Sequence, residues 1–152
     1  AEFHPGARCT ALRIRLQGDV SGADSVMQWQ TSYPFAVDLS RGYPRYNPGE
    51  YTANELLAQE SVDACLLLGA ETVPYFSDAA QARLRDIPTI VIDYPGTTTG
   101  FTPTVRVTTS VYGLHAPGTV YRMDNVPVTL KSLCHSDLPT DEDVLAAIAG
   151  RL

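Results

Sequence analysis

The chain has 152 residues, a net charge of −6 and a pI near 4.9, so it lacks the basic balance that nucleic-acid binders use to neutralise phosphates. Hydrophobic residues make up 44% of it and charged residues 18%, which is typical of a soluble globular protein and excludes a disordered tail. This length suits one ordinary domain with its own core.

The sequence shows no sign of a membrane or secretory role. No stretch approaches the roughly 18 consecutive apolar residues of a membrane span, and the segment from Ala1 has neither the basic nor the apolar region of a signal peptide. Three widely spaced cysteines, Cys9, Cys65 and Cys134, favour unpaired thiols in a reducing compartment. We therefore expect a cytoplasmic protein with neither nucleic-acid nor membrane partners.

The first half of the chain predicts few regular elements. Apolar and basic residues alternate over residues 12–16, which predicts a strand with one solvated face. Residues 22–30 fit a short helix, whereas prolines and glycines exclude regular structure over residues 33–51. Thr52 and Glu55 then have the spacing of a capping box, so a helix should begin there.

The middle of the chain predicts a β-α-β unit. Residues 64–68 form a short apolar run ended by a glycine, which suits a strand buried on both faces. We expect a helix over residues 73–84, capped by Thr72, and then a second buried strand over residues 89–93. Two strands joined by a helix within about thirty residues indicate a parallel sheet with a right-handed crossover.

The last third adds a strand, a hairpin and a helix. Residues 104–109 alternate as another strand, and residues 118–123 and 126–130 flank a two-residue turn. Thr140, followed by three acidic residues, predicts the start of a final helix. We therefore predict the α/β class: a parallel-sheet, Rossmann-like three-layer domain with a small hairpin, occupying residues 1–152 as a single domain.

A cofactor would be expected at the carboxyl ends of the parallel strands. The candidate residues there are Gly69, Glu71 and Asp93, and Asp93 could accept hydrogen bonds from a ribose or a guanine edge. Alternatively, Gly69 is a turn glycine and Asp93 is a solvated strand end. Two observations speak against bound phosphate: the glycine-rich nucleotide motifs are absent, and Glu71 adds negative charge.

No catalytic or metal-binding residues are predicted. The three histidines are scattered, and the adjacent pair Cys134 and His135 would point to opposite sides of an extended chain. A zinc site needs three or four convergent ligands. No family-specific nucleophile motif is present either.

The segment over residues 33–51 contains many aromatic residues and two arginines. Tyr and Arg are enriched in binding hot spots, so the segment is a candidate interface; alternatively, it packs on its own domain. Arg41 and Arg45 could hold it in place by hydrogen bonds to backbone carbonyls or to Asp38 and Glu50. The candidate interface residues are Tyr33, Arg41, Tyr43, Arg45 and Tyr46.

This same segment resembles the B subunit of formylmethanofuran dehydrogenase. The resemblance is carried by the run WQTSYPFAVD from residue 29 and the run SRGYPRYNPGE from residue 40. It extends through residues 62–64, 90–93 and 118–127, and so over nearly the whole chain.

The resemblance implies a molybdopterin oxidoreductase relative. In that family the B subunit holds molybdenum or tungsten on a bis-pterin guanine dinucleotide and reduces carbon dioxide to formate, which another subunit condenses onto methanofuran. The family's metal-ligating and iron–sulfur cysteines belong to its N-terminal half, so this chain is expected to be a C-terminal fragment of a longer subunit. After the first buried strand, metal-dependent members have a small residue, then Asp or Asn and Pro. This chain has GAET from Gly69 instead.

Because of these departures, the aerobic methylotroph relatives are the better match. We therefore expect the B subunit of a formyltransferase/hydrolase complex in one-carbon metabolism, structural rather than catalytic, with the other subunits as partners and no cofactor in this chain. One alternative is an oxidoreductase subunit that binds the tungsten or molybdenum pterin dinucleotide. Another is a stand-alone nucleotide-binding domain.

Overall fold

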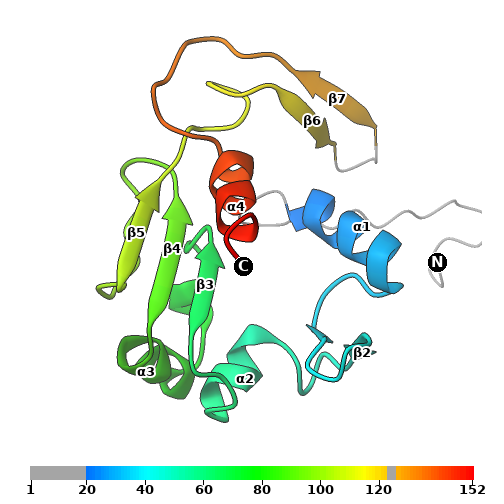
Figure 1. Ribbon diagram of the computed structural model, residues 1–152, viewed down its shortest axis with the longest axis vertical. Coiled ribbons are helices and arrows are strands. Elements are labelled where there is room, and N and C mark those ends of the chain that lie inside the picture. Colours follow the sequence, from blue (N-terminus) through cyan, green and yellow to red (C-terminus); the bar gives the residue numbers. More distant parts are fainter. Residues whose placement is uncertain (1–19, 123–125) are drawn as a thin grey trace, which may run out of the picture.

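A computed structural model describes residues 20–122 and 126–152 of the chain (Figure 1). The strand predicted at residues 12–16 and the hairpin turn at residues 124–125 lie outside these residues. The elements, in chain order, are α1 (Val20–Thr31), β1 (Val37–Asp38), β2 (Arg45–Tyr46), α2 (Ala53–Ala58), β3 (Cys65–Leu68), the 3-10 helix η1 (Val73–Tyr75), α3 (Asp78–Asp86), β4 (Thr89–Asp93), β5 (Val105–Thr108), β6 (Gly118–Tyr121), β7 (Pro127–Leu130) and α4 (Asp141–Ala149).

Three parallel strands form the central sheet, in the order β3-β4-β5. Leu66 of β3 lies opposite Ile90 of β4, which in turn lies opposite Val105 of β5. The chain passes from β3 to β4 through η1 and α3. The predicted β-α-β unit and the α/β, Rossmann-like fold are therefore confirmed.

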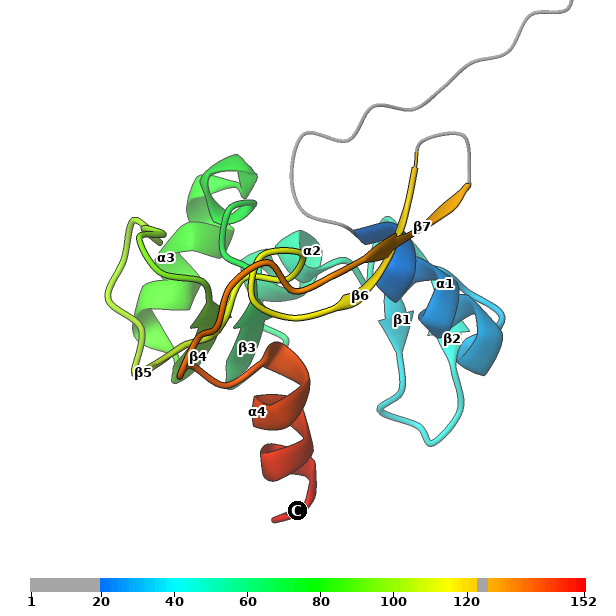
Figure 2. The same ribbon diagram turned by 90° about the horizontal axis from the view of Figure 1, so that it is seen from above.

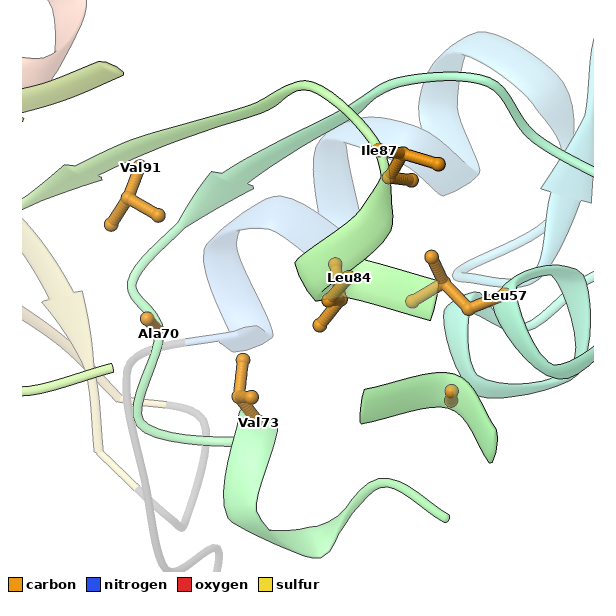
Figure 3. Close-up of a cluster of buried hydrophobic side chains, with 7 residues drawn as sticks. Leu57, Ala70, Val73, Leu84, Ile87 and Val91 are labelled. Atoms are coloured by element: carbon orange, nitrogen blue, oxygen red, sulfur yellow. The ribbon is translucent and has the colours of Figure 1, made fainter. Parts of the chain in front are cut away.

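The hydrophobic core lies on one face of this sheet. Val91 of β4 points toward α3 and α2, where Leu84 and Leu57 are fully buried (Figure 3). Cys65 and Leu67 of β3 pack against the same cluster. Burying a leucine side chain stabilises a fold by about 1.5–3 kcal/mol, so this layer fixes α2 and α3 to the sheet.

The opposite face of the sheet is covered only in part: Ile92 of β4 is fully buried there, but alternate residues of β3 are exposed. The prediction that residues 64–68 are buried on both faces is therefore wrong. The side chains of Leu66 and Leu68 are 43% and 51% exposed. Both α2 and α3 lie on the other face, and α4 begins beside the sheet but runs away from it (Figure 2). Three layers can be traced, but the third leaves Leu66, Leu68 and Val105 exposed.

The predicted helix over residues 73–84 is two helices. Residues 73–75 form η1, Phe76 is extended, and α3 begins after Ser77, whose hydroxyl accepts a hydrogen bond from the Ala80 N–H at 3.3 Å. Thr72 caps neither helix through its side chain. The Ser77 N–H donates to Asn54 Oδ1 of α2 at 2.8 Å. This contact favours the break, because Ser77 then joins α2 to the start of α3.

The two other predicted helix starts differ in their caps. Thr52 has the extended backbone of an N-cap, but its side chain makes no capping bond, so the predicted capping box of α2 is wrong. Glu55 instead accepts a hydrogen bond from its neighbour Asn54. At α4, Thr140 and Asp143 form a complete capping box, which confirms the predicted helix start.

The remaining elements lie to one side of the sheet. β6 and β7 form the predicted antiparallel hairpin, with Gly118 opposite Leu130, and α1 lies beside β6 (Figure 2). No helix within the described ranges is long and apolar enough to cross a membrane.

The position of the α3 cap can be tested with a pair of variants. We expect Ser77→Ala to lower the free energy of unfolding by about 1 kcal/mol, because α3 loses its capping oxygen. Thr72→Ala is the matched control and should change it little, since the Thr72 hydroxyl caps nothing. Urea denaturation measures both, and a larger loss for Thr72→Ala would contradict this assignment.

The capping box of α4 makes a prediction about pH. Hydrogen bonds from the backbone N–H and hydroxyl of Thr140 lower the pKa of Asp143. The carboxylate therefore stabilises the helix above its unfolded-state pKa, and this contribution is lost as the pH falls through the lower folded-state pKa. Thr140→Ala removes the hydroxyl donor and should raise the pKa of Asp143 toward its ordinary value.

An NMR titration of the Asp143 side chain measures this change. Thr129→Ala, at an exposed position in β7, is the control and should leave that pKa as it is. An unchanged pKa in Thr140→Ala would show that the hydroxyl does not act on Asp143.

Candidate functional site

The loops that follow β3 and β4 meet at the carboxyl edge of the sheet, because the two strands are parallel neighbours. After Leu68, the chain turns at Gly69, whose φ of +73° lies in the left-handed region that favours glycine. Its N–H donates to the Ile92 carbonyl at 2.9 Å. Gly69 therefore has the role of a turn glycine that closes the strand pair.

Asp93 ends β4 and is only 3% exposed, so it is not a solvated strand end. One carboxylate oxygen accepts a hydrogen bond from the Ala70 N–H at 3.1 Å, and the other accepts from the Tyr94 N–H at 2.9 Å. A buried carboxylate is costly unless its oxygens are hydrogen-bonded. Asp93 therefore ties the loop after β3 to the end of β4.

Glu71 and Tyr94 connect the same two loops at the surface. The Tyr94 hydroxyl donates a hydrogen bond to Glu71 Oε1, and this bond, followed by desolvation and the nearby Glu71 charge, raises the pKa of Tyr94. The structure thus brings all three predicted cofactor residues, Gly69, Glu71 and Asp93, to one edge. No sequence pattern indicated the role of Tyr94.

This edge does not fit the pyrophosphate of a pterin dinucleotide well. Phosphate sites in such folds offer free backbone N–H groups or cations. Here the Ala70 N–H is already bonded to Asp93, and the exposed loop presents the Glu71 carboxylate. The assignment of these residues to a dinucleotide stays a prediction.

The two histidines within the described residues make separate contacts. His115 accepts a hydrogen bond from the Val111 N–H through Nδ1, whereas His135 pairs with Asp137 at the surface. Within residues 20–122 and 126–152, no three His, Cys, Asp or Glu side chains are grouped so that they could hold a metal ion.

The aromatic segment over residues 33–51 is more ordered than predicted, because β1 and β2 pair as two short antiparallel strands. The rings of Tyr33 and Tyr46 stack, with 4.9 Å between centroids and an interplanar angle of 4°. Phe35 meets the Tyr46 ring edge-on at 5.8 Å. Aromatic pairs of this kind contribute about 0.5–1.5 kcal/mol beyond their buried area, so they hold the segment together.

Arg45 holds the segment from its other side. Its guanidinium forms an ion pair with Asp38 and lies 4.9 Å from the Tyr51 ring centroid. The predicted Arg45–Asp38 contact is therefore confirmed. Glu50 accepts a hydrogen bond from Asn47 instead of an arginine, and Arg41 is exposed, with no hydrogen bond inside the described part of the chain.

The five predicted interface residues therefore fall into two groups. Tyr33, Arg45 and Tyr46 contact one another or their neighbours within the segment. Arg41 and Tyr43 point outward, and Tyr43 is 53% exposed. The segment thus presents an exposed tyrosine and arginine on a rigid support, and its use as an interface stays a prediction.

Comparison with known proteins places this fold and these residues in context. No family model matches the chain. It is 40% identical over 122 residues to the B subunit of the tungsten-containing formylmethanofuran dehydrogenase 2 of Methanocaldococcus jannaschii, covering 80% of this chain and 28% of that protein. It is 36% identical over 115 residues to the protein of the same name from Methanococcus maripaludis, covering 76% and 26%.

A solved structure has the same fold. A chain of the formyltransferase/hydrolase complex from Methylorubrum extorquens, crystallised with methylofuran, superposes with a TM-score of 0.71 at 24% identity. The match covers 88% of this chain and 37% of that one. The chain spans about a quarter of the length of the curated relatives that it matches, and it is a homologue of the B subunit of formylmethanofuran dehydrogenase.

Proposed function

We propose that this chain is a structural part, from the C-terminal region, of the B subunit in a cytoplasmic formyltransferase/hydrolase complex, where other subunits carry out catalysis. Its homology to the B subunit of formylmethanofuran dehydrogenase and its fold similarity to a chain of such a complex support this proposal. The observation that carries it lies at the carboxyl edge of the sheet, where the loops after β3 and β4 are hydrogen-bonded to each other. Glu71 is hydrogen-bonded to Tyr94 there, beside the buried Asp93.

The charge at this edge explains why a dinucleotide is disfavoured. A phosphate about 4 Å from the Glu71 carboxylate would meet a repulsion of about 1–4 kcal/mol, depending on how much water screens it. Asp93 cannot turn away to make room, because both of its oxygens accept backbone N–H groups. A structural subunit, by contrast, does not need the Glu71 or Asp93 carboxylate to be free to bind a ligand.

A pterin-binding oxidoreductase subunit is the second candidate. It is favoured by the names of both curated relatives, which are tungsten-containing enzymes. In this case Gly69, Glu71 and Asp93 would line the dinucleotide site, and the Tyr94–Glu71 hydrogen bond would have to open. The tungsten or molybdenum held by the pterin would supply the redox chemistry, and the residues of this chain would only hold and orient the dinucleotide.

The aromatic segment is the proposed contact with partner subunits. Tyr43 and Arg41 are exposed, and Tyr46 is 38% exposed although it stacks on Tyr33. The stacked pair and the Arg45–Asp38 ion pair hold the segment that carries them. A preformed support lowers the entropy lost on binding, because few side chains remain to be ordered. Tyr43 is therefore the best single anchor for a partner.

Metal analysis separates the two candidate functions. We expect the complete native B subunit, purified with its partners, to contain far less than one tungsten or molybdenum atom per polypeptide and to release no guanine nucleotide on denaturation. A tungsten-containing formylmethanofuran dehydrogenase carried through the same procedure is the positive control. A near-stoichiometric metal content would overturn the structural assignment in favour of the oxidoreductase.

Three tyrosine variants test the interface in the co-expressed complex. Tyr43→Ala should leave folding intact but reduce the recovery of partner subunits at least several-fold, because an exposed anchor is lost. Tyr46→Ala should lower the free energy of unfolding by about 0.5–1.5 kcal/mol, because the stack with Tyr33 is lost. Tyr75→Ala is the matched control, since Tyr75 is exposed on η1.

Affinity co-purification and urea denaturation give the two readouts. Normal assembly of Tyr43→Ala would show that the segment is not the interface. Equal losses of assembly for Tyr43→Ala and Tyr75→Ala would show an unspecific effect.

A further inference from the structure

The outer edge of β3 is unpaired in the part of the chain that the structure describes. The N–H groups of Cys65 and Gly69 donate to carbonyls of Pro88 and Ile92 at 3.0 and 2.9 Å, on the β4 side. Backbone groups alternate in direction along a strand, so the N–H groups of Leu66 and Leu68 point to the free edge. β3 thus presents a row of backbone groups to which another strand could bind.

The same two leucines also belong to an apolar face that is covered only in part, because Ile92 is buried there but Leu66 and Leu68 are exposed. Leu66 lies in register with Ile90 and Val105, so three apolar side chains form one row across the sheet. Val105 is 47% exposed, like the leucines. Parallel sheets are normally covered on both faces, because their strands are apolar on both.

β3 also lacks the features that protect a natural sheet edge. Such edges usually carry a lysine, a proline, an inward-pointing charge or a bulge, which prevent pairing with another chain. The sequence of β3 is Cys-Leu-Leu-Leu, and its register with β4 is continuous from Cys65 to Leu68. An edge of this kind is a site of aggregation unless something covers it.

We propose that a segment of a longer B-subunit polypeptide, outside residues 1–152, adds a strand to β3 and covers the face formed by Leu66, Leu68 and Val105. This inference rests on the proposed function, in which the chain is one part of the B subunit. The chain spans 28% and 26% of its curated relatives and 37% of the solved neighbour, so most of such a polypeptide lies outside it.

The topology explains why the same polypeptide is the occupant. The strands run outward from β3 through β4 to β5, and α2 and α3 cover only one face. In a doubly wound sheet the second half starts from the first strand in the opposite direction and places its helices on the other face. The free edge and the uncovered face of β3 are the two surfaces that such a second half would use.

Amide hydrogen exchange at single-residue resolution tests the proposal in the complete native polypeptide. The N–H groups of Leu66 and Leu68 should exchange at least tenfold more slowly there than in residues 1–152 alone. Leu67 is the internal control, because its N–H alternates to the β4 side and should be protected in both. Fast exchange of Leu66 and Leu68 in the complete polypeptide would overturn the proposal.

Two further outcomes would assign the edge to another occupant and also overturn the proposal. Protection in residues 1–152 that increases with protein concentration would identify a second copy of the chain. Protection there that is lost in residues 20–152 would identify the first 19 residues. Failure of the proposed function is seen separately, as metal in the purified complex, whatever the exchange at β3.

A variant of the uncovered face gives a second readout. In the complete polypeptide, Leu68→Asp should lower the denaturation midpoint in urea, because it places a charge under the covering segment. Leu133→Asp is the matched control at an exposed leucine outside the sheet and should leave the midpoint unchanged. Equal midpoints for the two variants would show that nothing covers Leu68.

Discussion

The arrangement of this chain depends on the buried carboxylate of Asp93. It lies where two parallel strands end, and its two oxygens accept the N–H groups of Ala70 and Tyr94. Hydrogen bonds to a charged group contribute about 1.5–3 kcal/mol each, and the charge would be costly to bury without them. Asp93 therefore fixes the beginning of the loop that leads from β3 into η1 and α3.

This constraint also decides the chemistry of the edge. The Asp93 carboxylate is buried with a backbone N–H on each oxygen, and the Ala70 N–H that it occupies is not available to a phosphate. Glu71 and Tyr94 extend the same connection to the surface. At this edge the loops after β3 and β4 are therefore joined to each other by hydrogen bonds within the chain.

The sequence predicted those elements that depend on local patterns. The short apolar runs of β3 and β4, with a helix between them, were enough to predict the β-α-β unit, and the acidic residues after Thr140 predicted α4. The cap of α3 could not be predicted, because Ser77 is held by Asn54, 23 residues earlier in the chain. The exposure of Leu66 could not be predicted either, because it depends on which elements cover the sheet.

In the candidate sites too, contacts between residues close in sequence were predictable and contacts that depend on the fold were not. The Arg45–Asp38 pair was predictable from charge and proximity in sequence, whereas the stacking of Tyr33 on Tyr46 joins residues across an irregular segment and leaves no periodic signal. The role of Tyr94 depends on the meeting of two loops, which is a property of the sheet and not of either loop sequence.

The placement of Cys65 has a practical consequence. Its thiol packs against the core between β3 and α3, and burial raises its pKa, whereas Cys134 is exposed; both are free. Because the thiolate is the reactive form, we expect an alkylating reagent to modify Cys65 more slowly than Cys134. Because Cys65 is half-buried, the rate of its modification reports how closely β3 stays packed on the core.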